Sequence, residues 1–319
     1  MKIGGCIPSK PSKVLSGVPA GSILAPILFQ MFINDLPSSL KTSSYHIFAD
    51  DFQLYSSASL TNLNSLIATI NSDLERVEVW ASKNKMVLNP VKSVAMVISN
   101  KRLDINSIPP IKLNNTKIDF KQETKSLGLV LDSKLDWGAH IRHICAKVYN
   151  SLSKLAPHSK FTPIGVRLRL FKALILPHFN YCGQIFAGAC EENKSAWNDL
   201  NVASCARYVF NKKVGEHITH FSNKLVDCSL IAHFKFLVAN QIYRVVTSTK
   251  PIYLFEKLQP SFSKRTCNLN LPSRCRTRTR RSSFAVYGTK VWNSLNDQTK
   301  SSLNPRSFGI SCRKQLSDH

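Results

Sequence analysis

The spacing of hydrophobic residues changes from a strand pattern to a helix pattern within the first third of the chain. Residues 45–55 form two short apolar or aromatic stretches on either side of Asp50 and Asp51. This arrangement predicts a β-hairpin with the two carboxylates at its tip. Apolar side chains then recur every three or four residues over 63–77, which predicts an amphipathic helix ending near Trp80.

Other segments around this hairpin also have recognisable patterns. Residues 23–33 are apolar on nearly every face, so they predict a buried helix, and Ser22 is suited to cap it. Short apolar runs at 86–88, 94–98 and 127–131 predict further strands. Small antiparallel sheets with helices indicate the α+β class.

Beyond about residue 137 the helical pattern dominates. Amphipathic or apolar helices are expected near 141–155, 166–176, 196–210 and 230–246. From 258 onward the composition shifts to Ser, Arg, Thr and Asn, apart from an aromatic patch at 284–295. We therefore predict three regions, with bounds 1–137, 138–257 and 258–319.

Charge is the strongest feature of the composition. The 319 residues carry 43 Lys and Arg against 19 Asp and Glu, a formal net charge of +24. Of these, 19 basic and only 5 acidic residues lie in 211–319. Such a field attracts polyanions and favours nucleic acid over acidic metabolites as a partner.

The remaining global features bear on location. No apolar run approaches the roughly 20 residues of a membrane span, and the first residues lack the apolar stretch of a signal peptide. Nine scattered cysteines without a CxxC pair indicate reduced thiols. We expect an intracellular protein, in the nucleus or cytoplasm, that is not secreted and has no membrane partner.

One group of Cys and His residues is the nearest candidate for a metal site: Cys205, His217, His220, Cys228 and His233. Its spacing matches no standard zinc module, and scattered buried thiols are the favoured interpretation.

Asp50 and Asp51 are the strongest candidates for chemistry. Adjacent carboxylates on a hairpin tip can hold Mg²⁺, which prefers oxygen ligands. Two such ions about 3.5–4 Å apart support phosphoryl transfer. An isolated Asp-Asp pair is more often a solvated turn or a helix cap, so its order among other motifs matters.

That order resembles a known family. GVPAGSILAPILFQMFINDLP precedes FADDFQLY, and then WASKNKMVLNPVKS and KSLGLVLDSKLDWGAHI follow. The C-terminal stretch SSFAVYGTKVWNSLN also fits. Together these motifs resemble the reverse transcriptases of non-LTR, jockey-like retrotransposons. The resemblance is strong over 14–140 and looser afterwards.

The resemblance implies a partial reverse-transcriptase palm, an antiparallel sheet with helices, followed by a mostly helical thumb and C-terminal region. It implies DNA synthesis on an RNA template from a DNA primer, with dNTPs and Mg²⁺. Asp50 would bind metal directly, and Asp51 would support the hairpin and the metal site. Gly17, Pro19 and Gly21 would form a loop near template and nucleotide, where a Cβ would collide. An ordinary turn before a helix is the alternative for this loop.

Lys92 would lie near the departing pyrophosphate, with a plain surface lysine as the equal alternative. Two positions depart from the family pattern: Ala20 replaces a glutamine and Ala25 replaces a glycine. The family's other catalytic aspartate would lie on a strand before residue 1. We therefore expect this chain to be a truncated product that is inactive alone, with an unpaired sheet edge that favours aggregation.

A basic run near the C-terminus is the last candidate site. Five arginines lie within eight residues: Arg274, Arg276, Arg278, Arg280 and Arg281. In an extended or flexible segment they can contact phosphates without reading sequence. A solvated linker is an equal alternative, and a nuclear localisation signal is another. The aromatic side chains of Phe284, Tyr287 and Trp292 are expected to pack together rather than stack on bases. A non-enzymatic nucleic-acid-binding protein derived from a retroelement is therefore the alternative function.

Overall fold

The structure of the chain is a computed structural model. It describes residues 17–18, 21–192, 202–226, 228–259, 268–271 and 275–317. The chain folds into two compact units. The N-terminal unit comprises the described residues up to Val97 together with Lys101–Lys121, and the C-terminal unit comprises Ile98–Asn100 and the described residues from Gln122 onward.

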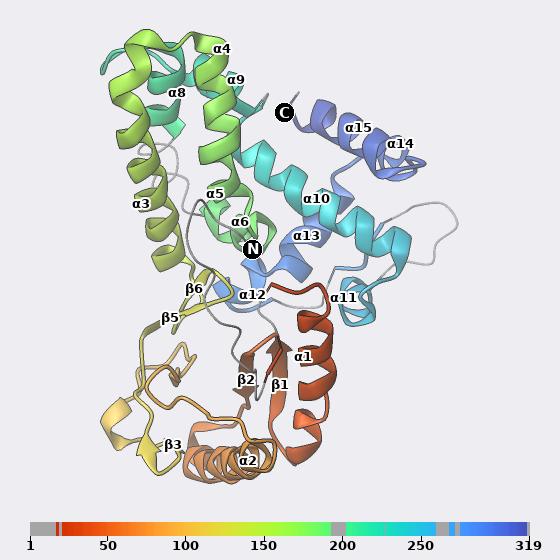
Figure 1. Cartoon of the computed structure of the whole chain (residues 1–319). Coiled ribbons are helices and arrows are strands. Elements are labelled where there is room, and N and C mark those ends of the chain that lie inside the picture. The colour runs from red at the N-terminus through yellow and green to blue at the C-terminus, as the bar shows by residue number, and fades with distance from the viewer. Residues whose placement is uncertain are drawn as a thin grey trace. The chain divides into compact units, whose positions relative to one another are not determined.

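The N-terminal unit combines two α-helices with two small hairpins (Figure 1). Its α-helices and strands are α1 (Ala25–Ile33), β1 (Ser44–Phe48), β2 (Asp51–Tyr55), α2 (Leu63–Lys83), β3 (Lys112–Leu113) and β4 (Thr116–Lys117). Three short 3₁₀ helices connect them, at Leu36–Ser39, Leu60–Asn62 and Ile105–Ser107. The predicted hairpin at 45–55 and the predicted helix at 63–77 are both confirmed.

Helix α1 forms as predicted, but the expectation that it is buried is wrong. Only Ile33 on this helix is buried, whereas Ile27 and Met31 are 52% and 71% exposed. Ile33 packs with Leu36 and Val77 in a small cluster, and the described residues provide no second layer for the other faces of α1. The sequence pattern correctly predicted that α1 is apolar, but it did not predict how many of its side chains are buried.

The strands expected at 86–88 and 94–98 are also wrong. Neither segment forms a strand, and their described pairing is limited to one parallel bridge between Ala95 and Phe120. That bridge uses the N–H of Ala95 to the carbonyl of Asp119 (3.1 Å) and the N–H of Lys121 to the carbonyl of Ala95 (2.8 Å). Apolar side chains in these segments, such as Val97, instead pack against a small cluster around Ile67.

The C-terminal unit is mostly helical and begins with one hairpin (Figure 1). Strands β5 (Glu123–Ser126) and β6 (Leu129–Asp132) meet at a two-residue turn in which Leu127 and Gly128 both have positive φ. The α-helices are α3 (Gly138–Leu155), α4 (Ile164–Leu170), α5 (Leu176–Asn180), α6 (Gly183–Glu192), α8 (Ala203–Phe210), α9 (Thr219–Val226), α10 (Leu230–Ser248), α11 (Ile252–Leu258), α12 (Arg278–Ser282), α13 (Phe284–Asn293), α14 (Asp297–Lys300) and α15 (Pro305–Ser317). A 3₁₀ helix (Ala156–Phe161) follows α3, and a π-helical segment (Phe171–Ile175) joins α4 to α5.

One hydrophobic core runs through this unit from α3 to α15. Helix α10 lies at its centre, with ten buried side chains, and contacts α6, α13 and α15. Thr219–Ser248 is long and apolar enough to cross a membrane by length and composition, and 59% of its most apolar window is buried inside the unit. A core helix passes the same test, and the packing of α10 is that of a core helix.

The aromatic patch near the C-terminus is part of this core. Tyr287 and Trp292 are buried, and the ring of Phe308 stacks on Trp292 and on Tyr243. The expectation that these aromatic residues pack together is confirmed. The α+β class is likewise confirmed, with small antiparallel sheets first and mostly helices afterwards.

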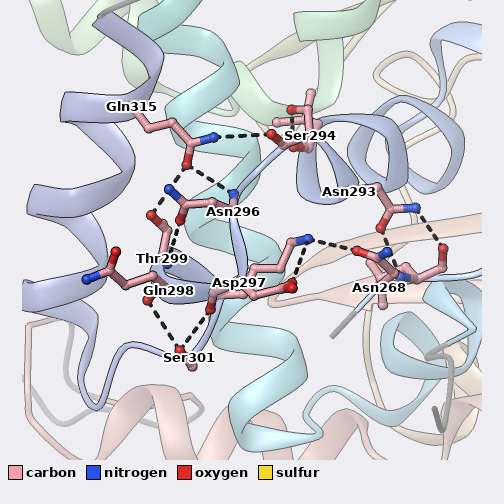
Figure 2. Close-up of polar contacts among 12 residues, drawn as sticks. Asn268, Asn293, Ser294, Asn296, Asp297, Gln298, Thr299, Ser301 and Gln315 are labelled. Atoms are coloured by element: carbon pink, nitrogen blue, oxygen red, sulfur yellow. Dashed lines mark hydrogen bonds and ion pairs between the residues drawn. The ribbon is translucent and has the colours of Figure 1, made fainter. Parts of the chain in front are cut away.

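Side-chain amides fix the last helices to one another (Figure 2). Oε1 of Gln315 accepts hydrogen bonds from the N–H of Asn296 (3.2 Å) and the hydroxyl of Thr299 (3.4 Å), and its Nε2 donates to the carbonyl of Ser294 (3.2 Å). The amide of Asn293 pairs with both backbone groups of Leu269, each at 2.9 Å. The described part of 258–319 is therefore held by specific packing.

Candidate functional site

The hairpin of β1 and β2 presents the acidic pair at a two-residue turn. Phe48 pairs with Asp51, so Ala49 and Asp50 occupy the two central positions of the turn. Only the first of them, Ala49, has positive φ (52°), as in a type II′ turn. A non-glycine residue in that region is uncommon, and such backbone strain clusters at functional sites.

Both carboxylates of the pair are exposed to solvent. Asp50 lies in the turn and Asp51 begins β2, so the two side chains leave the backbone at adjacent positions. Exposed carboxylates are the hard oxygen ligands that Mg²⁺ takes, usually one or two at a time together with substrate phosphates. The pair thus fits a divalent metal as a partial ligand set. Within the described residues, no group of three or more His, Cys, Asp or Glu is placed to hold a metal.

A buried carboxylate on α2 fixes the chain that leads into this hairpin. Asp73 accepts hydrogen bonds from the N–H groups of Lys41 (3.0 Å) and Ser43 (2.8 Å) and from the hydroxyl of Thr42 (2.8 Å). Arg76 completes the set with an ion pair at 2.6 Å. Burial alone would raise the pKa of Asp73, but these backbone and hydroxyl donors outweigh it and hold the pKa well below its usual range.

Sequence reasoning did not single out Asp73, although a signal was present. The residue lies on the apolar face of α2, three positions after Ile70 and four before Val77. A charged residue on a buried helix face needs partners, so this spacing predicts a structural anchor. The anchor positions β1, which starts at Ser44.

A second contact joins α2 to the segment after α1. The indole Nε1–H of Trp80 donates to Oδ1 of Asp35 at 3.1 Å, and the ring of Phe32 meets Trp80 edge-on at 6.1 Å. Ile47 and Phe52 of the hairpin pack against the same small cluster. The acidic turn is therefore supported from one side by α2 and its neighbours.

The glycine loop before α1 is described only in part. Gly17 and Gly21 both have φ of 82°, and a Cβ built on either would meet none of the described residues within 4 Å. Within this chain the requirement for glycine is therefore the backbone conformation, and close approach to template or nucleotide stays a prediction. The hydroxyl of Ser22 accepts from the N–H of Ala25 (3.2 Å), but the N-cap position of α1 is occupied by Leu24, which makes no side-chain cap hydrogen bond. Pro19 lies outside the described residues.

Lys92 lies on an exposed turn that Asn89 organises. The N–H of Lys92 donates to Oδ1 of Asn89 at 3.1 Å, and the hydroxyl of Ser93 donates to the carbonyl of Asn89 at 2.9 Å. The Lys92 side chain is exposed. Its role near pyrophosphate stays a prediction.

The arginine run is partly helical rather than extended throughout. Arg276 precedes α12, which contains Arg278, Arg280 and Arg281, while Arg274 lies outside the described residues. The hydroxyl of Thr277 caps this turn by accepting from the N–H of Arg280 (3.2 Å). A Cβ at Gly188 of α6 would collide with the carbonyl oxygen of Ser282, so α12 lies directly against α6. The four described arginines are exposed on a segment that packing holds in place.

Two cysteines of the Cys and His group are core residues. Cys205 and Cys228 are buried, and burial raises the pKa of the Cys205 thiol to about 12. His233 is also buried, with Nε2 2.6 Å from Oδ1 of Asn180. The favoured interpretation of these residues as packed side chains agrees with their burial.

Comparisons with known proteins match the segment that contains the acidic hairpin. A family model described as reverse transcriptase (RNA-dependent DNA polymerase) matches residues 3–131. The resemblance to jockey-like reverse transcriptases is confirmed. The RNA-directed DNA polymerase from mobile element jockey of Drosophila melanogaster is 26% identical over 194 residues, which cover 56% of this chain and 20% of that protein.

Other relatives agree with this assignment. The probable RNA-directed DNA polymerase from transposon BS of Drosophila melanogaster is 27% identical over 249 residues, or 68% of this chain and 27% of that protein. The retrovirus-related Pol polyprotein from type-1 retrotransposable element R1 2 of Nasonia vitripennis is 24% identical over 60% of this chain and 48% of its own length. The matches thus span only about a fifth to a half of these relatives. No solved structure matches.

Reverse transcriptases as a family act on a nucleic-acid template with nucleotide substrates, and they generally use divalent metals such as Mg²⁺. The match at 3–131 includes Asp50, Asp51, Lys92 and both described glycines of the loop. The arginine run lies beyond it.

Proposed function

We propose that the N-terminal unit supplies one carboxylate-bearing hairpin of an RNA-directed DNA polymerase. The observation that carries this proposal is the exposed Asp50–Asp51 pair on a two-residue turn, within the segment matched by the reverse transcriptase family. Asp50 would ligate Mg²⁺ directly, and Asp51 would support the turn and the metal site. When bound, the metal would stabilise charge on the reacting phosphate oxygens.

The substrates of this proposal are an RNA template, a DNA primer and dNTPs. Gly17, Pro19 and Gly21 would form the loop beside template and nucleotide, and Lys92 would provide a cation near the departing pyrophosphate. The protein would act inside the cell, in the nucleus or cytoplasm, where template and nucleotides are present.

We further propose that this polypeptide alone does not extend a primer. Two divalent ions bring four positive charges, and the hairpin offers two carboxylates on one side of them. Residues 1–34 contain no Asp or Glu, and the nearby acids Asp35 and Asp73 are already engaged by Trp80 and by the 41–43 segment. Among the described residues, no group of three or more His, Cys, Asp or Glu is placed to hold a metal, so we propose that a separate polypeptide segment supplies the further carboxylate.

Two measurements test this proposal. Mn²⁺, which is visible by electron paramagnetic resonance, should bind the chain weakly, and Asp50→Asn should abolish that binding while Glu75→Gln should not. Glu75 is an exposed acid on α2 and makes the matched control. Equal Mn²⁺ binding by both variants would contradict the metal role of Asp50.

The second measurement is primer extension on a primed RNA with Mg²⁺ and dNTPs. The chain alone should give no product, and adding a separate reverse-transcriptase fragment with fingers and the rest of the palm should restore Asp50-dependent product. Extension by the chain alone that disappears in Asp50→Asn would show that the proposed inactivity is wrong.

The charge of the C-terminal region favours a second function, nucleic-acid binding without catalysis. Residues 211–319 hold 19 basic and 5 acidic side chains, and the described arginines of the run are exposed. Binding should weaken steeply with salt, persist in Asp50→Ala, and fall when Arg276, Arg278 and Arg280 are replaced by Ser. Unchanged affinity of that triple variant would rule out the run as a binding surface.

A further inference from the structure

A pocket with a cavity volume of about 630 Å³ opens on the C-terminal unit, away from the acidic hairpin in sequence. Segments that lie far apart along the chain form its wall: 98–100, Lys134, the end of α11, and 277–286. Pockets of roughly 300–1,000 Å³ accommodate small organic ligands. This one is therefore large enough for a nucleotide unit, and larger than a single phosphate group requires.

The charged side chains that line the pocket are all positive. Lys134, Lys257 and Arg280 line it, and none of the described residues that line it is acidic. Among the described residues, none of these three forms an ion pair. Three unpaired cations around one concave surface create a local positive potential that favours an anion.

The cations are carried by segments with fixed backbone. The carboxylate of Asp132 accepts hydrogen bonds from the N–H groups of Lys134 (2.9 Å) and Trp137 (3.0 Å), which shapes the loop that carries Lys134. The hydroxyl of Thr279 donates to the carbonyl of Lys134 at 3.5 Å and so joins this loop to α12. Ser99 extends the same wall through its N–H to the carbonyl of Ser133 (3.1 Å).

The remaining wall provides apolar surface and hydroxyl groups. Ile98, Ala285 and Val286 line the pocket with apolar side chains, and Thr277 and Ser283 line it with hydroxyl groups. Apolar surface beside cations suits a ligand with both an anionic group and a ring, because each part then meets a complementary surface. Nucleotide units of a nucleic-acid strand have this combination.

We propose that this pocket binds the phosphate backbone of a single nucleic-acid strand. Lys134, Lys257 and Arg280 contact phosphate oxygens, and the apolar wall takes one sugar or base. The proposal places one arginine of the run, Arg280, in the pocket, together with two lysines that lie outside the run. The inference rests on the proposed nucleic-acid binding by the C-terminal region.

The test replaces the two lysines, because they line the pocket but do not belong to the arginine run. Lys134→Gln with Lys257→Gln removes two charges, and Lys154→Gln with Lys224→Gln removes two from exposed helix positions that do not line the pocket. Fluorescence anisotropy of labelled single-stranded RNA and DNA gives Kd over a range of salt for the full chain. All variants change exposed side chains only, and circular dichroism checks that they fold.

The pocket variant, Lys134→Gln with Lys257→Gln, should raise Kd about tenfold at moderate salt. It should also reduce the slope of log K against log salt by about 1.4, because two phosphate contacts on a single strand are lost. The control variant should change Kd by less than about twofold. Equal weakening by both variants would overturn the pocket, because net charge alone would then explain binding. Unchanged binding by the pocket variant, with loss in the arginine variant, would overturn the pocket and leave the proposed nucleic-acid binding intact.

Free nucleotide is the other source of the same phosphate chemistry. Unlabelled dNTP and inorganic phosphate, added as competitors, should displace the labelled strand only at concentrations far above the strand's own Kd. If dNTP binds the wild type, loses affinity in the lysine variant, and strand binding does not change, the site takes a free nucleotide and the strand assignment is wrong. Absence of strand binding by the wild-type chain would refute the proposed binding function and this inference together.

Discussion

The two units of this chain bury their apolar side chains to very different extents. Among the described residues, the C-terminal unit has one core of 32 buried residues, whereas the N-terminal unit has two clusters of five and three. Large apolar side chains of the N-terminal unit stay in contact with water, including Ile23 (91% exposed) and Phe48 (65%). Since burial of apolar area is the dominant favourable term in folding, most of the stability should reside in the C-terminal unit.

The difference also separates two kinds of candidate site. The acidic turn lies on a hairpin with little core of its own, in the unit whose large apolar side chains are exposed. Exposed apolar patches mark interaction surfaces or aggregation liabilities. The cationic pocket lies on segments that pack against a large core. We therefore expect the pocket to keep its geometry in the chain as it is, and the acidic turn to depend on additional packing.

The largest expected effect comes from a core aromatic residue of the C-terminal unit. Phe308 is fully buried between Trp292 and Tyr243, so Phe308→Ala should lower the free energy of unfolding of that unit by about 4 kcal/mol. The exposed Met31 is the counterpart in the N-terminal unit, and Met31→Ala should change stability by less than about 0.5 kcal/mol. Hydrogen exchange measured by mass spectrometry reports each unit separately. Comparable losses for both variants would contradict the contrast between the units.

A glycine contact gives the next largest effect. A side chain at Gly188 would collide with the backbone of Ser282, so Gly188→Ala should destabilise the C-terminal unit by about 2 kcal/mol and expose α12 amides to exchange. Gly165 in α4 has nothing within 4 Å of an added Cβ, so Gly165→Ala should stabilise by about 0.5–1 kcal/mol. Thermal denaturation of the two variants beside the wild type distinguishes these signs. Stabilisation by both would mean that α12 is not held against α6.

Asp73 should matter as much to the N-terminal unit as a core residue does. Asp73→Asn removes the charge that four donors of the 41–43 segment require, and it should cost about 2 kcal/mol. Because the pKa of Asp73 is lowered in the folded state, its stabilisation is present above about pH 4, the pKa of the unfolded chain, and is lost as pH falls further. The exposed Glu75, changed to Gln, is the control on the same helix.

The measurement is hydrogen exchange of β1 and of residues 41–43 in both variants, at pH 7 and under acid conditions. At pH 7, β1 and residues 41–43 should exchange faster in Asp73→Asn than in the wild type. Under acid conditions that protonate Asp73 in the wild type, the wild type and Asp73→Asn should exchange at the same rate. If both variants exchange at the wild-type rate at pH 7, the anchor role is refuted.

Local patterns predicted the elements of the site, but not the contacts between distant segments. The hairpin at 45–55 and α2 follow from periods of two and 3.6 residues, which the chain encodes locally. The burial of α1 and the strands at 86–88 and 94–98 were wrong because both depend on partners that an apolar run does not specify. The cationic pocket was not predicted, because it unites side chains more than 100 residues apart.

The smallest expected effect on stability is at the acidic turn, and it is informative for that reason. Asp50 is exposed and accepts no described hydrogen bond, so Asp50→Asn should change the unfolding free energy of the N-terminal unit by less than about 0.5 kcal/mol. The same substitution should abolish Mn²⁺ binding, since the amide replaces a charged ligand. Loss of metal binding with unchanged hydrogen exchange in β1 and β2 assigns Asp50 to a site rather than to the fold. Faster exchange of the hairpin in Asp50→Asn would instead show that the carboxylate serves the turn, and the metal role would no longer follow.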